Sequence, residues 1–223
     1  MTSGANKKAE PLSLDRSLHP LQRIAGQLHL IKQLPRTGWK VRGVHQVESV
    51  AAHSTGVGVW CLWLASRHEE KTQESVDRGI LLSLAMLHDL SEAALGDLIP
   101  AQKALLFGDD PAAQKEAIRR AEERFWDRLA EADDSLPLAQ TTQSIISEWK
   151  ALWKIYRDGS TVEARLVKQA DLLDCVMQAI VYRSVEGVPL DEFARLLPKA
   201  ASNDAELLSW LQEQWEQAWQ KDR

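Results

Sequence analysis

Cysteine is scarce in this chain. Cys61 and Cys175 are the only two among 223 residues, and neither has a second cysteine close by in the sequence. A CxxC redox motif and a cysteine-rich zinc site are therefore excluded, and both thiols are interpreted as small core residues in a reducing compartment. The sequence also lacks any run of about 18 uncharged apolar residues, and no apolar segment follows Lys7 and Lys8 near the N-terminus. We expect a cytoplasmic protein without a membrane span.

A strong positive charge is also missing. The chain contains 27 lysine and arginine residues against 32 aspartate and glutamate residues, which gives a formal net charge of -5. No sequence-wide positive field attracts nucleic acid or an anionic membrane, so neither is expected as a partner. Hydrophobic residues make up 44% of the 223 positions, which favours one globular domain with a sizeable core.

No convincing strand, repeat or low-complexity segment is found, and the pattern that is present is helical. Residues 1–17 are polar without apolar periodicity and are expected to form a flexible tail, which leaves residues 18–223 as the folded domain. The expected fold class is all-α. Helical spacing of apolar residues predicts helices near residues 20–31, 48–67, 77–95, 109–129, 145–156, 160–185 and 204–219.

Capping residues predict where two of these helices begin. Ser160 and Glu163 form a capping-box pattern at the start of the helix near residues 160–185. Ser202 or Asn203 is an acceptable cap for the last helix.

A buried helix that carries charge is the first sign of chemistry. The run ILLSLAMLHDL is apolar on nearly every side, yet it contains His88 and Asp89. An unpaired buried carboxylate costs several kcal/mol, so a partner is expected. A divalent metal ion satisfies this need, with His53 and Asp171 from other helices completing a mixed nitrogen and oxygen set. Spacing alone does not choose between Asp171 and Asp174, and a salt bridge or a hydrogen-bonded core histidine is the plainer alternative.

Two further carboxylates lie close to this pair in the sequence. Glu92 follows His88 by four residues and is expected on the same helix face, where it would orient or deprotonate a water molecule. Asp97 follows Gly96 at the predicted helix end and is interpreted as an acid, a base, a substrate anchor or only a turn cap. Without a metal, a solvated carboxylate is an equally good interpretation of Glu92.

The order of these residues resembles a known pattern. HD-domain hydrolases carry a histidine, then a His-Asp pair, then an aspartate on several helices, and here that order is His53, His88-Asp89 and Asp171. Four segments are similar to the bacterial 5'-deoxynucleotidase branch of this superfamily, and the resemblance covers roughly residues 20–185. These segments are PRTGW (35–39), ESVAAHS (48–54), HDLSEAALGD (88–97) and VKQAD (167–171).

The resemblance implies a role for each matching residue. It implies an HD-domain helical bundle and selects Asp171, the first aspartate after VKQA, over Asp174. HD enzymes with two metals carry extra histidines after the pair, and none follows His88 here, so one divalent ion is expected. Cobalt or manganese is favoured, while magnesium, iron and zinc are also compatible with these ligands. The implied residues are His53, His88, Asp89 and Asp171 for the metal, Glu92 and Asp97 for catalysis, and Arg36, Trp39 and Lys103 for the substrate.

The resemblance also implies a reaction, the hydrolysis of a deoxynucleoside 5'-monophosphate to a deoxynucleoside and phosphate. A triphosphohydrolase or a hydrolase of a signalling nucleotide on the same scaffold is one alternative. A non-catalytic helical module with a structural metal is the other.

Two pairs of tryptophans are spaced by four residues, Trp149 with Trp153 and Trp215 with Trp219. This spacing favours core or dimer packing, and we expect a homodimer.

Overall fold

The computed structural model describes residues 18–131 and 135–220 of the chain, so the tail predicted at residues 1–17 lies outside the described residues. The predicted all-α class is confirmed, since the described residues form helices and one isolated bridge between Pro35 and Ser49. The helices are α1 Pro20–Gln33, α2 Thr37–Lys40, α3 Val50–Thr72, α4 Arg78–Leu87, α5 Glu92–Leu95, α6 Pro100–Phe107, α7 Pro111–Ala130, α8 Ala139–Asp158, α9 Val162–Glu186, the 3-10 helix η1 Asp191–Leu196, α10 Leu197–Ala201 and α11 Ala205–Gln220.

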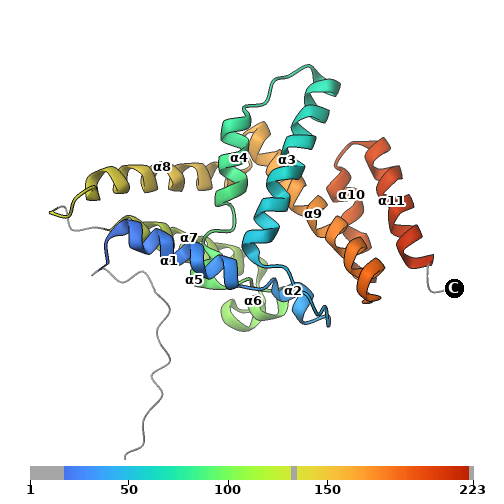
Figure 1. The fold of residues 1–223 in the computed structure, drawn as a ribbon, viewed down its shortest axis with the longest axis horizontal. Coiled ribbons are helices and arrows are strands. Elements are labelled where there is room, and N and C mark those ends of the chain that lie inside the picture. Colours follow the sequence, from blue (N-terminus) through green and yellow to red (C-terminus); the bar gives the residue numbers. More distant parts are fainter. Residues whose placement is uncertain (1–17, 132–134, 221–223) are drawn as a thin grey trace, which may run out of the picture.

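Two long helices, α3 and α9, cross near the middle of the molecule (Figure 1). Helices α10 and α11 pack against α9 on one side, whereas α1, α5, α6 and α7 lie together on the other (Figure 1). The buried apolar side chains accordingly form two cores. The larger core joins α3, α4, α9, α10 and α11, and the smaller core joins α1, α7, α8 and the start of α3.

Helix α3 links the two cores and places one histidine between them. Ser49 caps this helix by accepting a hydrogen bond from the Ala52 N–H, which fixes its start. Val50 then belongs to the smaller core and Val57 to the larger core. His53 lies between these two valines and is fully buried. The chain therefore supplies a polar side chain at the place where the cores meet.

The predicted helix over residues 77–95 is wrong in one respect, because it is broken into α4 and α5. Four turn residues, 88–91, follow Leu87, and Leu90 N and Glu92 N bond to the carbonyls three residues earlier instead of four. The His88 ring also bonds to the Ala85 carbonyl, 2.7 Å away, which satisfies one of the acceptors left open at a helix end. The His-Asp pair consequently lies in a turn at the end of α4.

Two predicted helix caps differ from the structure. Thr161, instead of Ser160, caps α9 by accepting from the Ala164 N–H, while the Glu163 carboxylate accepts from the Asp77 N–H. Asp204, instead of Ser202 or Asn203, accepts from the Leu207 N–H at the start of α11. In both cases the residue next to the predicted cap has the side-chain oxygen that reaches the unpaired N–H groups of the first helical turn.

No single helix of the described ranges is long and apolar enough to cross a membrane. Arg78–Leu95 and Pro100–Phe107 reach that length and apolar character only together, as a pair bent by 53°.

Trp153 is buried in the smaller core, and Trp215 stacks on Trp219 with ring centroids 4.0 Å apart. The tryptophan pairs expected to serve core or dimer packing thus pack within the chain.

Candidate metal centre and active site

His88 presents one ring nitrogen to the centre of the molecule. Its Nδ1 lies 2.7 Å from the Ala85 carbonyl, and a carbonyl oxygen only accepts, so Nδ1 carries the proton. In the neutral ring Nε2 therefore keeps a lone pair, and this atom is buried without a hydrogen-bond partner. An orphaned, buried imidazole nitrogen is costly unless another group, such as a cation, uses the lone pair.

His53 lies between two aspartates of helix α9. Its Nδ1 is 2.7 Å from Asp174 Oδ2, and its Nε2 is 3.1 Å from Asp171 Oδ1. The two aspartates are three residues apart, so they project from the same helix face on which His53 packs. Spacing left Asp171 and Asp174 as alternatives, and the structure gives each of them one ring nitrogen of the same histidine.

Asp89 brings the two histidines together. Its Oδ2 lies 3.1 Å from His88 Nε2, without hydrogen-bonding geometry, and 3.8 Å from His53 Nε2. Ligand atoms that share one metal ion at about 2.1 Å lie roughly 3 Å or more apart. The donor atoms of His53, His88 and Asp89 all fall within 4.8 Å of one another, so the residues fit a single divalent cation.

The charges around this cluster also favour a cation. Burial lowers the pKa of His53, but hydrogen bonds to Asp171 and Asp174 outweigh it and raise this pKa to about 10. Burial likewise opposes protonation of His88, whose pKa is nevertheless raised by the Asp89 carboxylate. The same negative surroundings that hold protons on these rings attract a metal ion, which competes with the protons for the Nε2 lone pairs.

Glu92 and Asp97 flank this cluster from helix α5 and the turn after it. Burial, followed by Asp89 and Asp97, raises the pKa of Glu92 to about 9, and one of its oxygens is buried without a partner. Asp97 is held in place because it accepts a hydrogen bond from the Thr37 N–H. Arg36 Nη1 donates to Asp89 Oδ2 at 3.3 Å, and its Nε lies 3.7 Å from Asp97 Oδ1. The structure thus brings both carboxylates and Arg36 to the centre.

A cavity of about 350 Å³ opens beside the centre on this side. Arg36 and Asp97 line it, together with Lys103 of α6. Trp39 also lies on its wall, but the tryptophan is only 2% exposed, stacks on Phe193 and donates from its indole N–H to Glu48. The ring therefore shapes the wall and presents little of its face to the cavity.

Sequence reasoning missed several residues of this region. Cys175, interpreted as a core residue, lines the same cavity, with its sulfur 3.9 Å from Asp171 Oδ1. Its place one turn after Asp171 on α9 was the available signal. The Tyr156 ring packs edge-on against His88, with centroids 5.5 Å apart. Helix α6, which carries Lys103, was also not predicted because its eight residues show little periodicity.

Comparison with solved structures places this arrangement among known folds. The crystal structure of the PH0347 protein from Pyrococcus horikoshii OT3 is similar with a TM-score of 0.63 and 26% identity, covering 86% of this chain and 98% of that one. A predicted metal-dependent phosphohydrolase from Magnetospirillum magnetotacticum MS-1 aligns with a TM-score of 0.57 over 90% of this chain and 92% of that one. Its identity is 20%, so it shows likeness of fold alone.

Comparison with curated proteins gives a consistent set of relatives. The 5'-deoxynucleotidase HDDC2 of Bos taurus is 33% identical over 78% of this chain and 72% of its own length. The protein of the same name from Danio rerio is 32% identical over 77% and 73%. The 5'-deoxynucleotidase YGK1 of Saccharomyces cerevisiae is 26% identical over 79% and 74%. A family model described as HD domain matches residues 28–206, and this chain belongs to the HD domain family.

Proposed function

We propose that the protein is a metal-dependent nucleotide phosphohydrolase that converts deoxynucleoside 5'-monophosphates to deoxynucleosides and orthophosphate. The observation that carries this proposal is the buried His88 Nε2, which forms no hydrogen bond and lies beside His53 and Asp89. The relatives named 5'-deoxynucleotidases supply the substrate class, because they match about three quarters of the chain.

Four side chains would hold the metal: His53 and His88 through their Nε2 atoms, and Asp89 and Asp171 through carboxylate oxygens. Their convergence from α3, from the turn after α4 and from α9 supports this assignment. When bound, a divalent ion supplies a Lewis acid that polarises a phosphate oxygen and lowers the pKa of water. Cobalt or manganese is the proposed ion because of the resemblance to HD-domain hydrolases, and the nitrogen and oxygen ligands are also compatible with magnesium, iron and zinc.

Glu92 is proposed to position the attacking water and accept its proton. A carboxyl group whose pKa is raised toward neutrality is a better base than an ordinary glutamate, and a nearby cation brings the value down from about 9. Attack by the water oxygen forms the new P–O bond as the bond from phosphorus to the 5' oxygen breaks. The proton taken from water then has a buried acceptor close to the reacting atoms.

Asp97 is proposed to deliver the proton to the departing 5' oxygen or to contact the sugar. Its hydrogen bond from the Thr37 N–H and its proximity to Arg36 hold it in one orientation. Arg36 and Lys103 would offset charge on the phosphoryl oxygens, an electrostatic contribution on which phosphoryl transfer depends. Trp39 is proposed to support the wall on which the nucleoside lies.

A phosphate-release screen of matched deoxyribonucleoside and ribonucleoside monophosphates with several metals tests the proposal. We expect orthophosphate and a deoxynucleoside from the monophosphates, and loss of turnover with retained metal binding in Glu92→Ala. Release of triphosphate from deoxynucleoside triphosphates would instead indicate a triphosphohydrolase. Absence of any product with a metal bound would favour the non-catalytic module.

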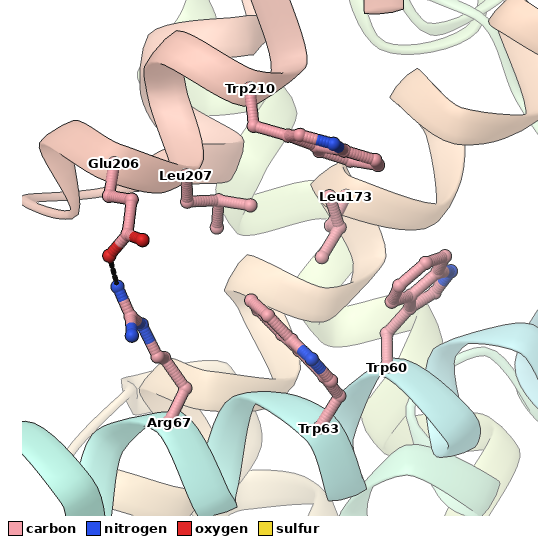
Figure 2. Close-up of a pocket in the computed structure, with 7 residues that line it drawn as sticks. All are labelled: Trp60, Trp63, Arg67, Leu173, Glu206, Leu207 and Trp210. Atoms are coloured by element: carbon pink, nitrogen blue, oxygen red, sulfur yellow. Dashed lines mark hydrogen bonds and ion pairs between the residues drawn. The ribbon is translucent and has the colours of Figure 1, made fainter.

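We also propose a homodimer in the cytoplasm. An apolar groove between α3 and α11 supports self-association, because Trp63 and Trp210 on its two walls are 45% and 44% exposed (Figure 2). The ion pair between Arg67 and Glu206 closes one end of this groove (Figure 2). A two-fold axis would place the same face of each copy against the other. Sedimentation should give a dimer for the wild type and a monomer for Trp63→Glu.

A further inference from the structure

A second cavity, of about 470 Å³, reaches the same centre from another direction. One part of its wall is formed by His88, Asp89 and Glu92, which it shares with the proposed active site. The rest of the wall contains four basic side chains and one acidic side chain, Glu122. Its cationic side chains are Lys103 of α6, Lys115 of α7, Arg157 of α8 and Lys168 of α9.

Two of these cations are held in place by neighbouring groups. Lys168 Nζ donates to the Arg157 carbonyl at 2.9 Å and lies 5.6 Å from the centre of the Tyr156 ring. Arg157 Nε lies 3.3 Å from Glu122, and this contact fixes its guanidinium beside the cavity. Helices α8 and α9 therefore present two positioned cations, while Lys115 faces them from the first turns of α7.

Three of the four basic side chains in this cavity have no carboxylate of the described residues within ion-pair distance. Within residues 18–131 and 135–220, no carboxylate forms an ion pair with Lys103, Lys115 or Lys168. Burial lowers the pKa of Lys168, and repulsion from Arg157 and Lys115 lowers it further, against a smaller opposing effect of Asp158. Like charges held together in this way raise the free energy of the folded protein, and a bound anion removes that cost.

We propose that this basic end is a second phosphate site, formed by Lys115, Arg157 and Lys168 and separate from the position of the phosphoryl group that is cleaved. The inference rests on the proposed function, because that function assigns the metal-binding side of the cavity to the scissile group. The ligand is a phosphate dianion, which is either the released orthophosphate or the terminal phosphate of a nucleoside diphosphate. Both have the charge and the acceptor oxygens that lysine and arginine bind.

Inhibition of deoxynucleoside monophosphate turnover tests the site, with orthophosphate and a deoxynucleoside diphosphate as separate inhibitors. Lys115→Gln and Lys168→Met should each raise the inhibition constant about tenfold, the effect of losing one hydrogen bond to a charged group. The KM for the monophosphate should stay within about twofold, because the scissile group contacts other residues. Lys199→Gln, the same change of charge at an exposed position on α10, should alter neither constant.

The two inhibitors distinguish the source of the phosphate. If the lysine variants raise the inhibition constant of orthophosphate alone, the site binds the released product. If they raise the inhibition constants of both orthophosphate and the diphosphate, the site also accepts a terminal phosphate. Unchanged constants in both lysine variants, or a parallel rise in KM, would overturn the proposal. If the wild type turns over no monophosphate, the proposed function fails, while titration calorimetry of orthophosphate into wild type and Lys115→Gln still tests the site. Equal affinity in these two proteins would then overturn it.

Discussion

His53 contacts two carboxylates of α9, one at each ring nitrogen. Asp171 and Asp174 therefore have different partners on the same imidazole ring. Asp174 Oδ2 accepts a hydrogen bond from the His53 Nδ1–H, 2.7 Å away, and this leaves Nε2 as the nitrogen available to the proposed metal. A carboxylate behind a ligating histidine orients the ring and makes its other nitrogen a stronger ligand. Asp174 is thus a positioning residue in the proposed site, acting through His53.

Asp174→Ala should weaken metal binding by about 10- to 100-fold, the usual effect of losing such a partner. Asp174→Asn should lose less metal affinity, because its amide oxygen still accepts a hydrogen bond from the Nδ1–H. Calorimetric titration of manganese into each variant measures the effect, with the exposed Glu148→Gln as a charge-matched control. Equal affinities in wild type and Asp174→Ala would contradict the role.

Gly56 explains how Asp174 comes so close to α3. A Cβ atom at residue 56 would lie 2.3 Å from Asp174 Oδ1, so the glycine leaves space for the carboxylate. Alanine normally stabilises a helix interior by about 1 kcal/mol over glycine. Gly56→Ala should instead lower the free energy of unfolding by about 1 to 3 kcal/mol, because overpacking outweighs propensity.

Gly58→Ala is the matched control for this prediction. Its added Cβ would find its nearest neighbour, Leu82 Cδ2, at 3.9 Å, which is ordinary contact. Urea unfolding followed by circular dichroism should show stabilisation of Gly58→Ala by about 0.5 to 1 kcal/mol. Stabilisation of both variants would mean that Asp174 moves away without cost.

At the scale of single residues, the sequence predicted which residue types form the site, but it did not predict which atoms are in contact. The order of His53, His88, Asp89 and Asp171, together with the family resemblance, predicted one shared site. The structure brings His53 within 4.8 Å of His88 and Asp89, and within 3.1 Å of Asp171. The contact of Asp174 with the other nitrogen of His53 depends on how α3 packs on α9, and no spacing within one helix contains that information. Trp39 illustrates the same limit, because its burial against Phe193 comes from η1, far along the chain.

Among the helices, periodicity predicted the long ones and capping rules predicted their ends only approximately. The predicted helix at 77–95 missed the break after Leu87, because the turn is stabilised by the His88 side chain bonding to the Ala85 carbonyl. Helix α6 was missed because it is short and packs on α7 with a mixed surface. The first feature depends on a local side-chain bond and the second on a tertiary contact, and helix propensity records neither.

Asp204 combines two tasks at the start of α11. It caps the helix through the Leu207 N–H and pairs with Arg67 and Lys71 of α3. The hydrogen bond from Arg67, outweighing burial, holds the pKa of Asp204 well below its usual range. Its contribution to stability is therefore present above the unfolded pKa, near 4, and is lost as the pH falls further.

Asp204→Asn should keep the cap and lose the ion pairs, whereas Asp204→Ala should lose both and cost about 1 kcal/mol more. Thermal unfolding at pH 7 measures the difference. At a pH below the pKa that Asp204 has in the folded state, the wild type and Asp204→Asn should have the same Tm, because the aspartate is then protonated. A constant difference across the acid range would show that the charge of Asp204 is not involved.

At the scale of the whole molecule, the proposed metal joins the two cores. Its ligands come from α3, from the turn after α4 and from α9, which meet where the larger and smaller cores contact each other. A ligand that binds only the folded state stabilises it by RT ln(1 + [L]/Kd), about 2.7 kcal/mol at 100 times Kd. Metal binding should therefore be visible in the stability of the entire chain.

Removal of the metal with a chelator should lower the Tm by about 5 to 10 °C at saturating starting metal. His88→Ala should lose this difference, because a ligand is absent. His29→Ala, at an exposed position on α1, should retain it. Differential scanning calorimetry with and without chelator measures all three proteins, and a difference that survives in His88→Ala would place the stabilising ion elsewhere.

The central claim is that His53, His88, Asp89 and Asp171 hold one divalent ion at which a nucleotide phosphate is cleaved. The most direct measurement is the metal bound per chain, together with orthophosphate released from deoxynucleoside monophosphates, in wild type and in the alanine variant of each ligand. We predict one ion per wild-type chain and loss of both metal and turnover in every variant. Full metal content and full turnover in Asp171→Ala would contradict the account.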